Sequence, residues 1–436
     1  MNSPTAFKGY HVAAAGTGIN LALGVLYTWS IFKDAIRQSI STGGVGSFNW
    51  ELARLNDPYA LCCLVFALMM IVAGRCQDRF GPRTTAITGG VLVGIGFIWI
   101  SQSTAYLSWV LGFGVLVGSG IAFGYASATP PAMKWFPPNR TGIVAGIVVS
   151  GFGLASVYIA PLAKYLLNQW GLQGAMLFFG IAFLLVVSTL ALFLVNPPTE
   201  YVPPGFVCRR QRTEHHQKAR EKFVEHEVPP LTMLKTPTFW LLWTIYFIGA
   251  GTGLMVIGSV AGMAKASLGA NAFLAVAFLA VGNAAGRVVA GSVSDKIGRG
   301  KTLAGIFFFQ AVLMSAAVPV TTQGGSNALL LVLLTSLIGF NYGANLAIFP
   351  SFAKDLWGIK NFGVNYGLLF TAWGLGGFVM SKASQMLIAS SGAMTDAFKA
   401  ATILLLIGGG LAFSIHNERE AKRKEIKKKL VTAVQT

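Results

Sequence analysis

The chain has 436 residues, of which 54% are hydrophobic and only 11% are charged. Soluble domains carry about 25% charged residues, so this composition excludes an ordinary soluble protein and indicates an integral membrane protein. The formal net charge of +18 does not indicate a nucleic-acid partner, because 25 of the 33 lysines and arginines fall in segments that would share one side of a membrane. This asymmetry follows the positive-inside rule.

Twelve apolar runs are long enough to cross a bilayer. Glycines spaced four apart, such as Gly282 and Gly286, allow close helix packing, so we expect an all-α integral membrane bundle. The positive-inside rule places both termini in the cytoplasm, for a multi-pass protein of the inner membrane. The expected spans are residues 9–33, 57–76, 84–103, 106–133, 141–166, 171–196, 238–264, 271–293, 302–321, 326–353, 361–388 and 394–415.

The sixth and seventh runs are separated by a charged segment with Pro-Pro pairs at both ends, which is typical of a linker. Related turns follow the second and eighth runs: GRCQDRFGPR begins at Gly74 and GSVSDKIGRGK at Gly291. This repeat indicates two six-helix halves in the same orientation, an arrangement that places a transporter's site at their interface. The expected division is a bundle at 1–196, a linker at 197–237, a bundle at 238–416 and a basic tail at 417–436.

The eighth apolar run contains Arg287, eight residues before the Asp295 that ends the run. Along a helix this places the arginine about 12 Å inside the membrane. An arginine at the membrane centre costs roughly 2.5 to 3.5 kcal/mol, so we expect it to face a polar cavity and bind an anion there. Asn283 lies one turn earlier on the same face. The alternative is a structural arginine that caps buried carbonyl groups.

The repeated GxxxDxxGxR turn, the twelve runs and the central linker resemble the major facilitator superfamily over nearly the whole chain. In such a turn the aspartate can accept hydrogen bonds from the first amides of the next helix and pair with nearby arginines. The two turns are therefore interpreted as a cytoplasmic latch and gate rather than as ligands for a cargo. Their residues are Asp78, Arg79, Arg83, Asp295, Lys296 and Arg299.

Shorter motifs are similar to the oxalate/formate antiporter branch, a bacterial relative of the monocarboxylate transporters. In that branch the arginine at the position of Arg287 binds a carboxylate, and oxalate carriers add a lysine where this chain has Trp373. A dianion in a low-dielectric cavity needs two positive partners, so a small monoanion such as lactate or pyruvate is favoured over oxalate. The motifs are GVLYTWSIF at 24–32, KWFPPNRTG at 134–142, LKTPTFWLLW at 234–243, the block 287–299 and NYG at 365–367.

The coupling mechanism is left open between two alternatives. Monocarboxylate transporters usually pair the arginine with an aspartate four residues earlier, where this chain has Asn283. None of the 15 acidic residues or five histidines is expected in mid-span, so no acidic or imidazole relay is expected inside the membrane. We favour symport of the anion with a proton over obligatory anion exchange of the oxalate/formate type.

Further candidates for the substrate site share a polar or aromatic side chain within a span. Each could instead serve helix packing or bond a neighbouring helix. Asn20 and Tyr27 lie on one stripe of the first span with Thr17 and Gly24. The full set of expected substrate-binding residues is Arg287, Asn283, Tyr27, Asn20, Tyr125, Tyr342, Asn345, Phe370 and Trp373.

A secondary transporter that works by alternating access is the function that the sequence favours. A membrane enzyme is disfavoured, because the spans carry no His, Asp/Glu or Ser constellation and the chain has no phosphate-binding loop. A solute sensor is disfavoured because the linker and tail are too short for a signalling domain. The expected partners are a small monocarboxylate anion, a proton and the lipid bilayer, with no nucleic acid, cofactor or metal. The protein is expected to be a monomer.

Overall fold

A computed structural model describes residues 4–44, 46–51, 54–55, 57–137, 140–198, 201, 227–257, 260–269, 272–322, 328–391 and 394–414. Within these ranges every regular element is a helix. The middle of the linker and the basic tail lie outside the described residues, so the expectations for them are not tested.

The first half of the chain forms a bundle of long helices. Helix α1 (Pro4–Leu23) passes through a 3-10 turn, η1 (Gly24–Thr28), into α2 (Trp29–Thr42). Helices α3 (Asp57–Phe80) and α4 (Pro82–Ser101) follow. A short α5 (Tyr106–Trp109) continues through a π-helical segment, η3 (Val110–Val117), into α6 (Gly118–Trp135), and α7 (Thr141–Ala191) ends the half.

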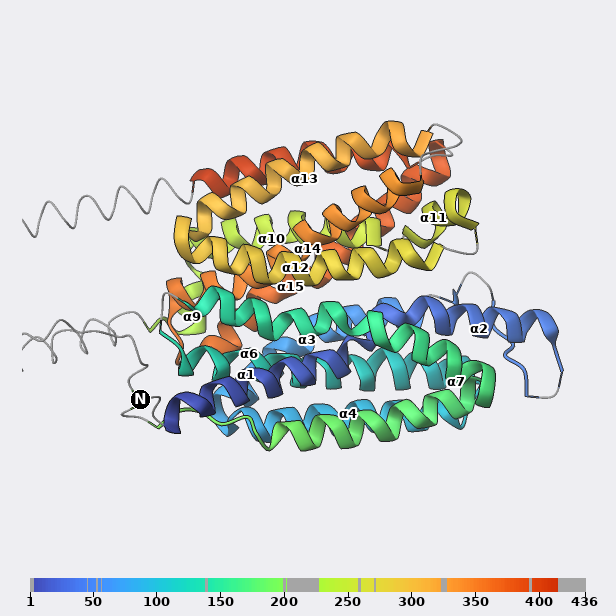
Figure 1. The fold of residues 1–436 in the computed structure, drawn as a ribbon, viewed down its shortest axis with the longest axis horizontal. Helices are drawn as coiled ribbons and strands as arrows, with labels where there is room; N and C mark the ends of the chain where they lie inside the picture. The colour runs from blue at the N-terminus through green and yellow to red at the C-terminus, as the bar shows by residue number, and fades with distance from the viewer. Residues whose placement is uncertain are drawn as a thin grey trace, which may run out of the picture.

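The second half repeats this arrangement after the linker. Its helices are α9 (Pro230–Leu234), α10 (Pro237–Ile257), α11 (Val260–Leu268), α12 (Ala272–Ile297), α13 (Arg299–Thr322), α14 (Ala328–Trp357) and α15 (Phe362–Ser391). A final helix runs over Thr395–Ser414. Figure 1 shows the two halves as separate groups of near-parallel helices, with α1 to α7 below and α10 to α15 above.

Eleven helices of the described chain are long and apolar enough to span a membrane. The count agrees with the twelve expected spans, because α7 contains two of them: it is interrupted at Gly171, whose φ of 67° is not helical. The first span was expected to end at residue 33, where its apolar run ends. The helix continues to Thr42 because the charged residues after position 32 end the apolar run without breaking the helix.

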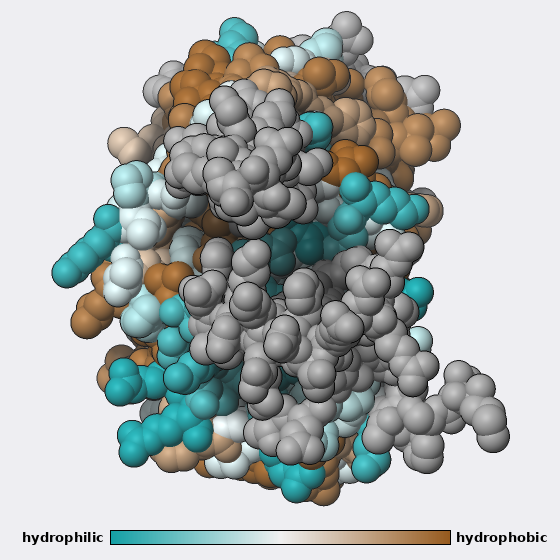
Figure 2. All heavy atoms as spheres, turned by 90° about the vertical axis from the view of Figure 1, so that its left-hand side faces the viewer, coloured by the Kyte–Doolittle hydropathy of each residue, from teal (hydrophilic) through white to brown (hydrophobic). Residues whose placement is uncertain are grey.

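The two halves meet mainly along α3 with α15 and α7 with α12, and α7 also contacts α14. Glycines permit this contact, because a Cβ at Gly74 would lie 2.0 Å from the carbonyl oxygen of Gly363, and one at Gly146 would lie 2.3 Å from that of Arg287. We call the end of the molecule that carries the turns after α3 and α12, together with residues 227–229, the linker end. Figure 2 views this end, where hydrophilic side chains gather while hydrophobic ones lie toward the flanks.

Candidate functional site

Arg287 is the centre of the candidate site and is completely buried. Its Nε donates a hydrogen bond of 2.9 Å to Oδ1 of Asn283, one turn earlier on α12. Its Nη1 donates to the backbone carbonyl of Val149. Its Nη2 has no hydrogen-bond partner among the described residues. Neither of the two acceptors is charged, so the contacts described for the guanidinium leave its charge uncompensated.

The contact with Val149 joins the two halves of the protein, because Val149 lies on α7 and Arg287 on α12. Two glycines of α7 leave room for the Arg287 and Asn283 side of α12. A Cβ at Gly146 would strike the backbone of Arg287, and a Cβ at Gly153 would lie 3.3 Å from Oδ1 of Asn283. Capping of a buried carbonyl, the alternative role for Arg287, therefore accounts for Nη1 but not for Nη2.

A chain of polar contacts also crosses between the halves through Tyr342. The indole Nε1 of Trp373 donates a hydrogen bond of 2.8 Å to the Tyr342 hydroxyl. The same hydroxyl lies 3.2 Å from the hydroxyl of Tyr27, which belongs to η1 in the other half. Tyr27 and Tyr342 are both within electrostatic range of Arg287. Four of the predicted site residues thus lie around one buried region.

Aromatic rings form the walls of this region. Phe66 of α3 packs against Phe370 at a centroid distance of 5.2 Å and against Trp373 at 5.4 Å. Phe370 and Trp373 stack at 5.0 Å. Phe152 of α7 contacts Tyr27 edge-on at 5.3 Å. Aromatic rings from both halves therefore line the region around Arg287.

Two predicted residues use their side-chain amide groups to bond backbone carbonyls. The Asn20 side-chain amide donates a hydrogen bond of 2.8 Å to the carbonyl of Val148, which ties α1 to α7. The Asn345 amide donates to the carbonyl of Asn341 within α14. The Asn345 oxygen points toward α10, since a Cβ at Gly249 would lie 3.0 Å from it. The Asn20 amide thus joins two helices, whereas the Asn345 amide bonds within its own helix. The side-chain oxygens of both residues have no hydrogen-bond partner among the described residues.

Sequence reasoning missed three groups that the structure brings to the site. Phe66 and Phe152 have no distinguishing motif, because phenylalanine is common in apolar spans. The Val149 contribution is a backbone carbonyl, which leaves no trace in residue identity. The one available signal was the pair Gly146 and Gly153 on either side of Val149, because small residues mark close helix contacts.

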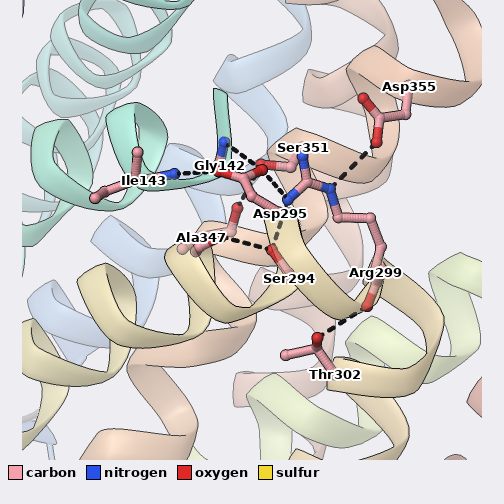
Figure 3. Close-up of polar contacts among 11 residues, drawn as sticks. Gly142, Ile143, Ser294, Asp295, Arg299, Thr302, Ala347, Ser351 and Asp355 are labelled. Atoms are coloured by element: carbon pink, nitrogen blue, oxygen red, sulfur yellow. Dashed lines mark hydrogen bonds and ion pairs between the residues drawn. The ribbon is translucent and has the colours of Figure 1, made fainter. Parts of the chain in front are cut away.

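At the linker end, Asp295 connects the halves (Figure 3). Its two carboxylate oxygens accept hydrogen bonds of 3.0 Å each from the amides of Gly142 and Ile143, the first turn of α7. Arg299 forms an ion pair of 2.6 Å with Asp295 and one of 3.2 Å with Asp355 on α14. The carboxylate thus compensates the positive end of a helix dipole that belongs to the other half.

Asp78 makes the matching contact on the other side of the interface. Its carboxylate accepts hydrogen bonds of 3.1 Å each from the amides of Gly363 and Val364, in the first turn of α15. The sequence led us to expect the next helix in the chain as the donor, but in both cases the donor helix belongs to the opposite half. Local sequence order does not show which helix start lies beside an aspartate once two halves pack together.

The other basic residues of the two turns are not bound to the aspartates in the same way. Arg83 donates a hydrogen bond of 2.8 Å to the carbonyl of Leu192, within the first half. Arg79 lies over the ring of Phe80 at 5.4 Å. Lys296 is exposed. Arg299 is therefore the basic residue that completes a latch in the described structure.

The end of the linker is attached to the turn between α14 and α15. The carboxylate of Glu227 accepts hydrogen bonds of 3.1 and 2.9 Å from the amides of Ile359 and Lys360. The amide of Val228 donates to the carbonyl of Trp357 at 3.1 Å. This turn leads directly into the first turn of α15, which Asp78 holds.

Comparisons with known proteins agree with this architecture. The Major Facilitator Superfamily profile matches residues 11–381. The chain is 27% identical over 359 residues to an oxalate:formate antiporter of Oxalobacter formigenes, which covers 80% of this chain and 77% of that protein. It is 26% identical over 378 residues to an apicoplast pyruvate carrier of Toxoplasma gondii, which covers 73% and 68%. It is also 26% identical over 401 residues to monocarboxylate transporter 13 of Bos taurus, which covers 91% and 86%.

Proposed function

This chain belongs to the major facilitator superfamily, as its motifs indicate, and we propose that it is a secondary transporter of short monocarboxylates such as lactate or pyruvate. The relatives named above carry small organic anions according to their names. The proposal for this chain depends on its own site, and above all on the unpartnered Nη2 of Arg287.

A buried guanidinium needs a negative partner, because an uncompensated charge in a low-dielectric interior costs several kcal/mol. Nε and Nη1 of Arg287 already bond neutral oxygens, and the described residues give it no ion pair with a carboxylate. A carboxylate of the cargo would accept from Nη2 and supply the missing charge. Its location between the two halves suits alternating access, since both halves contact the same bound anion.

A single negative charge on the cargo fits the remainder of the site. The position at which oxalate carriers place a lysine is the buried Trp373, whose indole is bonded to Tyr342. Lys382, on the same helix, is exposed. The rings of Phe66 and Phe152 suit a short alkyl end of the cargo.

We propose that the linker end is cytoplasmic, because 25 of the 33 lysines and arginines fall in the segments expected on this side of the membrane. The latches at Asp78 and Asp295 then close the cytoplasmic side. Proton symport is the coupling we favour, since a monoanion with one proton crosses without net charge. Obligatory exchange is the alternative, and the similarity to an oxalate:formate antiporter supports it.

Purified protein in liposomes separates these mechanisms. We expect labelled lactate to accumulate under an inward proton gradient, with competition by pyruvate and little by oxalate. Counterflow that proceeds without a pH gradient, together with uptake that ignores the gradient, would rule out symport in favour of exchange. Absence of any lactate or pyruvate movement would rule out the proposed cargo.

A further inference from the structure

Three tyrosine hydroxyls lie buried at the interface between the halves without a hydrogen-bond partner. They belong to Tyr125 on α6, Tyr246 on α10 and Tyr366 on α15. The three residues are 3%, 0% and 4% exposed, so bulk water does not satisfy their hydroxyls. A buried hydroxyl without a partner is unfavourable, so several at one place indicate a site for a polar ligand.

The three side chains gather around a single ring, that of Phe370. Their centroid distances to it are 5.6 Å for Tyr125, 6.2 Å for Tyr246 and 5.7 Å for Tyr366. The Tyr366 side chain interacts with those of both other tyrosines, although none of the three hydroxyls reaches hydrogen-bond geometry. The group spans the interface, because Tyr125 comes from the first half and the other two from the second.

This group lies on the linker side of Trp373. Tyr366 is in the second turn of α15, two residues after the Val364 whose amide Asp78 holds, whereas Trp373 is two turns farther along. Tyr125 and Tyr246 remain within electrostatic range of Arg287. Thr129, one turn beyond Tyr125 toward the linker end of α6, also has a buried, unpartnered hydroxyl. Unpartnered polar groups thus continue from the Arg287 region toward the latch of Asp78.

We propose that Tyr125, Tyr246 and Tyr366 form a second, uncharged station for the carboxylate of the cargo, between Arg287 and the linker end. Each hydroxyl donates one hydrogen bond to the anion, and the nearby charge of Arg287 favours the anion there. When the linker end opens, Tyr125 parts from the other two and the hydroxyls face the passage. The station lowers the barrier to leaving Arg287, and it contributes little to the resting affinity. This inference rests on the proposed monocarboxylate transport.

The double variant Tyr246→Phe/Tyr366→Phe tests the station, with lactate as the probe. Removing unpartnered hydroxyls leaves the rings in place and removes no bond, so we expect thermal stability at least equal to that of the unmodified protein. Lactate affinity measured by calorimetry on the purified protein should change by less than about threefold. The maximal rate of lactate uptake in liposomes should fall by about tenfold or more, because two charge-assisted bonds are lost in transit. The single variants should each show part of this loss.

The control is Tyr158→Phe, whose exposed hydroxyl bonds the carbonyl of Leu21 outside the interface. An unchanged uptake rate in the double variant would refute the station. The partner of the hydroxyls would then be a buried water and not the cargo. A loss of affinity equal to the loss of rate would overturn it too, because the tyrosines would then belong to the Arg287 site. If the unmodified protein moves no monocarboxylate, the proposed function itself fails, which is a different result.

Discussion

The Asp295 latch offers a direct test of how the linker end stays closed. Asp295→Asn keeps the shape of the side chain but removes its charge and one of its two acceptor oxygens. The carboxylate holds the amides of Gly142 and Ile143 at 3.0 Å and Arg299 at 2.6 Å, and its side chain is only 6% exposed. Bonds of this kind contribute about 1.5 to 3 kcal/mol each.

Losing one of these bonds and weakening the others should destabilise the closed linker end by about 3 kcal/mol, which changes the closed-to-open ratio more than a hundredfold. The assay is maleimide labelling of Thr129→Cys, a buried position on the linker side of the site, in a background with the four native cysteines replaced by alanine. We expect labelling from the linker end to rise strongly in Asp295→Asn.

The matched control is Asp355→Asn, which removes the other partner of Arg299. That carboxylate is 34% exposed, bonds Arg299 at 3.2 Å and does not cross between the halves. Its loss should cost about 1 kcal/mol or less and change labelling little. Equal labelling in the two variants, or no increase in Asp295→Asn, would refute the view that the contact between halves is what keeps this end closed.

Two further substitutions test the site. Gly146→Val would place its Cβ 2.3 Å from the carbonyl oxygen of Arg287, so uptake should fall at least tenfold. The control Gly305→Val has open space around its Cβ and should transport normally. Similar activity in both variants would mean that α7 and α12 need not approach closely. Trp373→Lys breaks the 2.8 Å bond to Tyr342 and adds a second cation. Lactate affinity should therefore fall about tenfold while oxalate begins to bind. No gain in oxalate binding by calorimetry would show that this position does not set the charge of the cargo.

Some parts of this site could be predicted from the sequence because they depend on spacing along one helix. Arg287 and Asn283 are four residues apart, and the structure places their side chains in contact. The repeated turns likewise placed Asp78 and Asp295 at one end of the bundle. The first prediction follows from helix periodicity, and the second follows from the internal repeat of the two halves.

The remainder depends on how distant helices pack. The latch partners of the two aspartates belong to the opposite half, and no local pattern specifies that pairing. The Val149 carbonyl reaches Arg287 only because glycines let α7 and α12 approach closely. Three helices contribute the group around Phe370, which consists of Tyr125, Tyr246 and Tyr366. These contacts follow from tertiary packing and are not encoded in any short stretch of the chain.

The central claim is that Arg287 binds the carboxylate of the cargo, and lactate uptake by Arg287→Ala in liposomes tests it most directly. Arg54→Ala is the control, because Arg54 is an exposed arginine paired with Glu51. We expect Arg287→Ala to be purified as a folded protein, to bind no lactate by calorimetry and to lose uptake, while Arg54→Ala retains both. Uptake and binding that persist in folded Arg287→Ala would contradict the account.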